Sequence, residues 1–415
     1  MRIKMNAYKQ EIKNYIKLFI FDLGLTDKKI MEYGMYLFAI VLFIGAAGAF
    51  KFIGIYLPAL FFLIRACLKG TIYKFWKSPI FIFLILFAFS GILSVFISRD
   101  LWQSLVFFEK YHIRPILIYL VIVTAFQNIR AFQKLLHLIA LTSFFYILWS
   151  YYEYFYEIIT FGSIGRVTSL NAAWPLLYIF SFVIREFFVA KTRKKKLFWA
   201  LIAYLSVVSL VISGQRSAVL GIFAICAIWI LYLNWKTKMI FVFSLTFCIV
   251  FFVVLAVSFP AVSTVMQDYV IRGIESAGRS DLLTLYWKIF EEHFWLGVGL
   301  DNDTISAVYL ETERSGLLPH FMMPHNYFLT TAVRQGVLGL LSFGLMILVT
   351  LISLARKVFR QNFDDQKASG IALLACMLGM YVFYATFTEI VLMPLAVILS
   401  LSAVFINLNN KQVAF

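Results

Sequence analysis

Three arginines and one histidine are the residues of this sequence best suited to chemistry on an anionic group: Arg166, Arg216, Arg279 and His325. Arginine keeps its charge and binds phosphate oxygens through two parallel hydrogen bonds. A neutral histidine can accept a proton near neutral pH. Together they fit displacement of an activated, lipid-linked diphosphate, with arginine neutralising the leaving group and histidine activating an acceptor hydroxyl.

The residues that ATP-dependent, metal-dependent or carboxylate-based catalysis would need are not apparent in the sequence. No nucleotide-binding glycine loop, HExxH motif or pair of carboxylates is apparent, so we expect neither ATP nor a metal ion nor a cofactor to take part. The four cysteines lie in apolar runs without paired spacing, which predicts neither a disulfide framework nor a zinc site.

The composition requires lipid as a solvent. The chain is 62% hydrophobic and 14% charged, far more apolar than a soluble domain. The net charge of +16 does not indicate nucleic acid, because the lysines and arginines occur in short bursts between apolar runs, and such bursts attract anionic lipid headgroups. We therefore predict an all-α polytopic membrane protein.

Apolar periodicity and length predict about twelve transmembrane helices. The remaining parts are a cytoplasmic amphipathic segment at 1–29, without a cleavable signal peptide, and a cytoplasmic tail at 408–415. Nine spans fall within 30–258 and three within 337–407. The predicted spans are 33–50, 52–68, 79–97, 106–126, 135–156, 173–190, 197–213, 216–233, 239–258, 337–355, 369–387 and 390–407.

Every second connection is rich in lysine and arginine, which places those connections in the cytoplasm and the others outside. One outward connection, 259–336, is long, polar and rich in tryptophan and phenylalanine, and a long loop in a compact protein is usually functional. We expect at least two helices in it. One covers 278–293, and the other opens at Pro324, with His325 in its first turn, and ends near Gly336.

The same topology places all four candidate residues on the outward side. Each has a simpler explanation. Arg216 could extend to lipid headgroups, Arg279 could pair with Asp281, and Arg166 or His325 could be structural. Their convergence on one side, from three separate connections, favours a single site.

The motifs around these residues resemble the bacterial O-antigen ligase and polymerase superfamily. Arg216 to Leu220 matches Arg-x-x-x-Leu, and His325-Asn326 followed by Gly336 and Gly339 matches a second ligase motif. The stretch from Arg279 to Gly299 is similar to the Gly-Arg…Trp…Gly-x-Gly pattern of the family, although Arg334 and Gln335 stand where members often carry an acidic residue.

The resemblance implies a fold like the GT-C glycosyltransferases and transfer of a polysaccharide from undecaprenyl diphosphate to lipid A–core. This would take place at the periplasmic face of the inner membrane. It implies His325 as the base, Arg216 and Arg279 as the diphosphate-binding pair, and Arg166 as a further binding residue. Gln215 and Asn326 are the remaining predicted substrate-binding residues.

Three alternatives stay open. An O-antigen polymerase or a protein O-oligosaccharyltransferase would use the same donor with another acceptor. A polysaccharide or lipid transporter would place its charged groups near the middle of the membrane, often in repeated halves. This sequence instead gathers its polar residues at one face.

Overall fold

The structure is a computed structural model of the chain. It describes residues 27–42, 48–69, 77–161, 166–212, 216–236, 277–312, 324–361, 364–385 and 392–408, with a few single positions between 238 and 250. Within these residues the backbone of Arg166, Arg216 and Arg279 is described but their side chains are not. The N-terminal segment before residue 27, the tail after 408 and most of the predicted span at 239–258 lie outside the described residues.

Every regular element in the described part of the chain is a helix, which confirms the all-α prediction. Most are long and apolar, as lipid-facing segments must be when backbone groups can be satisfied only within a helix. The first are α2 (Asp27–Val41), α3 (Gly48–Lys69), α4 (Pro79–Ile97), α5 (Leu101–Phe108), the π-helix η2 (Glu109–Ile113) and α6 (Arg114–Ala125). There follow α7 (Ile129–Phe161), α8 (Arg166–Val189), α9 (Arg193–Ile212), α10 (Arg216–Tyr232), α13 (Ala277–Glu292), α14 (Asn302–Thr312), α15 (Tyr327–Phe359), α16 (Asp365–Tyr384) and α17 (Leu392–Asn407).

Five helices of the described part are long and apolar enough to cross a membrane, and they show the general class of the protein. They are Gly48–Cys67 of α3, α4, Ile129–Glu157 of α7, α15 and α16. The shorter helices Ser217–Tyr232 and α17 are also apolar. The count of twelve spans and the likeness to GT-C folds stay predictions.

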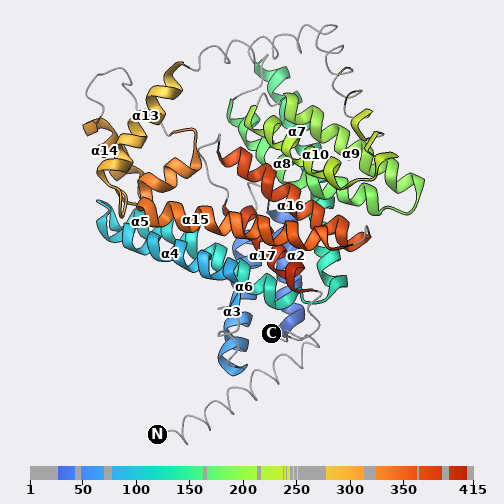
Figure 1. Ribbon diagram of the computed structural model, residues 1–415, viewed down its shortest axis with the longest axis horizontal. Coiled ribbons are helices and arrows are strands. Elements are labelled where there is room, and N and C mark those ends of the chain that lie inside the picture. Colours follow the sequence, from blue (N-terminus) through green and yellow to red (C-terminus); the bar gives the residue numbers. More distant parts are fainter. Residues whose placement is uncertain are drawn as a thin grey trace, which may run out of the picture.

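Helix α16 forms the centre of the bundle, since 78% of its apolar window is buried, against 39% for α15. Figure 1 shows α7 to α10 gathered on one side of α16, while α13 and α14 lie together at a distant end of the molecule, beside α5 and the start of α15. The residues of α13 and α14 form a small hydrophobic core of their own with the first turns of α15. We call α13, the segment 293–301 and α14 together the outer module.

Some predicted boundaries are confirmed and others are wrong. Helix α4 matches its predicted span, and α13 matches the predicted loop helix to within one residue. Lys51 does not separate two spans, because it lies within α3. Pro324 does not open a helix, since α15 begins at Tyr327. Helix α14 was not predicted.

Candidate functional site

His325 lies immediately before α15 and not in a first helical turn, which corrects the prediction from the sequence. Asn326 is the N-cap residue, with φ −153° and ψ 110°, and its side-chain oxygen accepts a hydrogen bond from the Leu329 N–H at 3.0 Å. An asparagine cap satisfies a backbone donor that the first turn leaves open. Asn326 thereby fixes the point at which the chain enters the helix and holds the half-buried His325 at its positive end.

Helix α15 breaks at Gly336, where φ is 66° and ψ is −164°. Only glycine adopts this conformation without strain, and a Cβ at Gly336 would overlap the carbonyl group of Trp295. The helix that the sequence predicts to end near Gly336 is therefore real, and a second helical segment follows it directly. The first turns of α15, 327–335, are a separate arm that carries His325 and Asn326.

The backbone groups released by the break are taken up by the segment 293–301. The Val298 N–H donates to the Val333 carbonyl at 2.8 Å and the Gly299 N–H to the Arg334 carbonyl at 3.3 Å. The Val337 N–H donates to the Phe294 carbonyl at 2.7 Å. The Gly-x-Gly of the sequence motif thus serves a structural purpose, because both glycines have positive φ and lie against the backbone of α15 or the end of α4.

Arg334 is a buried cation beside this break, only 6% exposed. Its Nη2 donates to Asn302 Oδ1 at 2.7 Å, and its guanidinium lies 5.3 Å from the centre of the Phe107 ring. Within the described part of the chain its Nε has no hydrogen-bond partner. A charge so costly to bury usually has a function, yet the sequence marked Arg334 only as a departure from the family pattern.

The last turn of α4, the connection that follows it and helix α5 hold the outer module in place. The Ser94 hydroxyl donates to the Leu296 carbonyl at 3.0 Å, and the Leu300 N–H donates to Ser98 Oγ at 3.0 Å. Further on, the Ser104 hydroxyl donates to the buried Asp301 carboxylate at 3.2 Å. These contacts join residues about two hundred positions apart, and no local pattern in the sequence indicates them.

A second polar cluster lies where the last residue of the arm, Gln335, meets α4 and η2. Gln335 accepts a hydrogen bond from the Ser90 hydroxyl at 2.8 Å, and its Nε2 lies 3.3 Å from His112 Nε2. His112 belongs to η2 and packs between Phe87 and Phe108. A π-turn often marks a functional region. Here η2 places the imidazole ring of His112 beside Gln335 of α15.

Helix α16 brings Arg216 and His325 to the same end of the bundle. Helices α10 and α16 run antiparallel, because Lys367 in the first turn of α16 lies over the ring of Tyr232 at the end of α10. They cross at Gly221 and Gly379, where a Cβ on Gly221 would lie 3.0 Å from the Gly379 carbonyl oxygen. Arg216 and Tyr384 both lie five residues beyond this crossing on the same side, about 7 Å along each helix. Tyr384 in turn packs on Tyr327, the first helical residue of the arm, with ring centres 5.6 Å apart.

The structure relates the other predicted residues less directly to the arm. Arg166 is the first residue of α8. This helix also packs antiparallel to α16, because Tyr178 contacts Cys376 while Arg185, further along α8, contacts Ser369. Arg279 lies in the first turn of α13, and no described contact brings it to the arm. Gln215 lies outside the described residues. All three arginines stand at helix N-termini, whose partial positive charge adds to their own attraction for anions.

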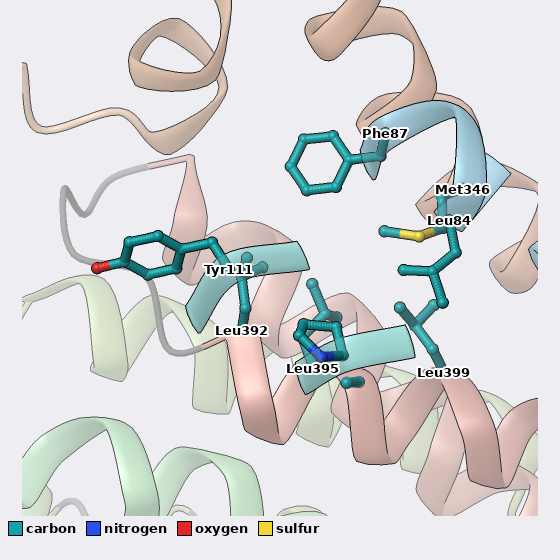
Figure 2. Close-up of a pocket in the computed structure, with 9 residues that line it drawn as sticks. Leu84, Phe87, Tyr111, Met346, Leu392, Leu395 and Leu399 are labelled. Atoms are coloured by element: carbon teal, nitrogen blue, oxygen red, sulfur yellow. The ribbon is translucent and has the colours of Figure 1, made fainter. Parts of the chain in front are cut away.

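An apolar cavity opens between α4, η2, α6, α15 and α17. Figure 2 shows Leu84, Phe87 and Met346 along one side and Leu392, Leu395 and Leu399 along another. Tyr111 lies at one end of the cavity, with its hydroxyl directed away from Leu395 and Leu399. Phe87 both lines this cavity and contacts His112, so the cavity and the polar cluster adjoin.

The core of the outer module excludes water from its tyrosines. Burial raises the pKa of the Tyr286 hydroxyl well above its usual value; nearby Tyr309 raises it further, while the charge of Arg334 lowers it. The two rings lie 5.9 Å apart. Tyr286 therefore stays neutral and acts as a packing and hydrogen-bonding group.

Several membrane-length helices and a broken helix with a capped histidine arm define the class: a helical membrane protein with a folded module at one face. Residues 201–344 match the family model described as O-Antigen ligase, which confirms the resemblance and supports membership of the O-antigen ligase and polymerase superfamily. The match contains Arg216, Arg279 and the arm but not Arg166. No curated protein matches the chain.

Proposed function

We propose that the protein transfers O-antigen polysaccharide from undecaprenyl diphosphate to a sugar hydroxyl of lipid A–core. The reaction takes place at the periplasmic face of the bacterial inner membrane and uses neither a metal ion nor ATP. The observation that supports this proposal is that the first residue of α10, Arg216, and the first helical residue of the arm, Tyr327, both lie toward the Tyr384 end of α16. Both residues fall within the stretch that matches the O-antigen ligase family.

The chemistry follows from the two residue types. His325 accepts the proton of the acceptor hydroxyl as its oxygen bonds to the first sugar carbon of the donor. The bond from that carbon to the diphosphate breaks at the same time, and undecaprenyl diphosphate leaves with the bonding electrons. Arg216 and Arg279 stabilise the negative charge that grows on it. Asn326 holds His325 in position through its cap.

The acceptor is best identified by reconstitution. Purified protein in lipid vesicles is given an undecaprenyl-diphosphate glycan with lipid A–core, free repeat unit or a pilin-type protein, each offered separately. We expect glycan to appear on lipid A–core. Growth of the free repeat unit would instead identify an O-antigen polymerase, and labelled protein a protein O-oligosaccharyltransferase.

Replacement of His325 by alanine tests the role of the base. The variant should remain folded in the membrane but lose at least about a hundredfold in transfer rate, since a positioned base contributes roughly 10² to 10⁴. His293→Ala is the matched control, because His293 is an exposed histidine of the outer module, which packs against the arm. Retained transfer by His325→Ala would remove the proposed base.

A further inference from the structure

We infer that the segment 293–301 is embedded in the outer leaflet of the membrane and that Phe294 and Trp295 contact lipid there. The sequence predicts this segment in an aqueous loop. The inference concerns the protein's contact with the bilayer and does not depend on glycan transfer. The outer leaflet is the one on the side of the outer module.

Depth along α4 is the first argument. Helix α4 has 19 residues, all apolar except Ser90 and Ser94. It is therefore about 28 Å long, which just matches a hydrocarbon layer of roughly 30 Å. Part of the segment 293–301 lies at the same depth as the last turn of α4. Its Leu296 carbonyl binds the Ser94 hydroxyl, three residues or about 5 Å inside that end, and its Leu300 N–H binds Ser98 just past it.

Backbone satisfaction is the second argument. Irregular backbone at membrane depth is tolerated only where protein satisfies its polar groups. Here the break in α15 and the serines of α4 do so. The carbonyls of Phe294 and Leu296 and the N–H groups of Val298, Gly299 and Leu300 all have protein partners. The Gly297 N–H donates to the His293 carbonyl at 2.9 Å.

The exposed side chains identify what covers the segment. Phe294 is 40% exposed and Trp295 is 69% exposed, although water-soluble surfaces seldom leave neighbouring large rings open. They continue a row of rings from Phe290, with adjacent ring centres 5.3 and 5.2 Å apart. Tryptophan is the residue that favours the headgroup boundary of a bilayer. Lipid, with its acyl chains and headgroups together, therefore fits this surface.

The lipid-exposed surface continues along the part of α15 that follows Gly336. Leu338, Leu341, Leu345, Leu348 and Ile352 are exposed large hydrophobic residues at the alternating spacing of three and four that marks one helical face. This stripe begins two residues after Gly336, against which the Trp295 carbonyl packs. The aromatic pair thus lies next to the break at which the stripe starts.

Fluorescence in brominated lipid tests the inference on the full chain. Wild type and Trp295→Phe, which keeps an aromatic ring, are placed in vesicles of ordinary lipid or of lipid brominated near the top of its acyl chains. The emission of Trp295 is the wild-type emission minus that of Trp295→Phe, and we call it the difference emission. We expect this difference emission to be at least twofold lower in brominated lipid than in ordinary lipid.

Trp229→Phe is the control, because Trp229 is fully buried between helices and its difference emission should be quenched much less. An unchanged elution volume in detergent checks that each variant is folded. If bromine leaves the Trp295 emission unaffected and aqueous iodide quenches it instead, the segment lies in water and the inference is overturned.

Discussion

At the scale of the residue, the site depends on how an arginine differs from a lysine. A guanidinium can hold two phosphate oxygens at once, whereas an ammonium is a point charge on a flexible stem. The three predicted arginines stand in the first turns of α8, α10 and α13, where the helix adds only a partial charge. Their contribution should therefore depend on geometry as well as on charge.

Arg216→Lys and Arg279→Lys should each lower transfer by about tenfold or more, because loss of one charge-assisted hydrogen bond costs about 1.5 to 3 kcal/mol. The measurement is the initial rate in reconstituted vesicles at a fixed donor concentration. Arg99→Lys is the matched control, since Arg99 forms an exposed ion pair with Glu311 and such pairs contribute little. Full activity in both site variants would refute a diphosphate-binding role.

Residue types could be predicted from the sequence, but their surroundings could not. The helix end at Gly336 follows from a local pattern, and the stretch 201–344 that matches the family model spans the motif with His325 and Gly336. Arg334 was overlooked because its burial comes from Phe107 and Asn302, which reach it from α5 and α14. Only folding brings these three residues together.

At the scale of the element, the broken helix α15 is the feature that shapes the site. A continuous helix from Tyr327 to Phe359 would be about 50 Å long, well beyond the thickness of a bilayer. The break allows the arm to turn away while the rest continues as a span. It relies on a glycine because the required φ is positive.

Gly336→Ala should destabilise the protein by about 2 kcal/mol or more, since the backbone conformation is nearly specific to glycine and the added methyl group meets the Trp295 carbonyl. We expect a lower Tm in detergent together with loss of transfer. Gly344→Ala offers a control in the same helix, because a Cβ there meets nothing within 4 Å and alanine favours helix. Equal Tm values for the two variants would contradict this account of the break.

Element ends were predicted less well than element bodies. The pair Pro324 and Asn326 offers two competing helix-start signals, a proline at the first helical position and an asparagine cap. The structure follows the cap. Helix α14 was missed because its start is defined by Asp301, whose carboxylate accepts from the Thr304 N–H at 2.6 Å within a stretch of weak apolar periodicity.

At the scale of the whole molecule, a buried ionic cluster ties α7, α8 and α16 together at the end away from the arm. Arg185 pairs with Glu186 and donates from Nε to the Ser369 hydroxyl at 3.0 Å. Glu186 also lies 2.8 Å from His137 Nδ1. Arg185 and Glu186 are both buried, so each depends on the other.

Glu186→Ala should lower stability by about 3 to 5 kcal/mol, because it leaves the Arg185 charge buried without its carboxylate. The double variant Arg185→Met with Glu186→Leu should recover most of that loss, since apolar packing often replaces a buried ion pair at little cost. Thermal unfolding in detergent measures both. Similar losses in the single and double variants would show that the pair matters for its shape and not for its charge.

The break at Gly336 also has a consequence for the order in which the interacting segments are synthesised. The carbonyls released by the break accept hydrogen bonds from the Val298 and Gly299 N–H groups, and Ser94 and Ser98 bind the neighbouring Leu296 and Leu300. All of these residues precede α15 in the chain. A ribosome therefore delivers the receiving surface before the interrupted helix. The arm can dock as soon as it emerges, so the unpaired backbone need never wait in lipid for a partner still to be made.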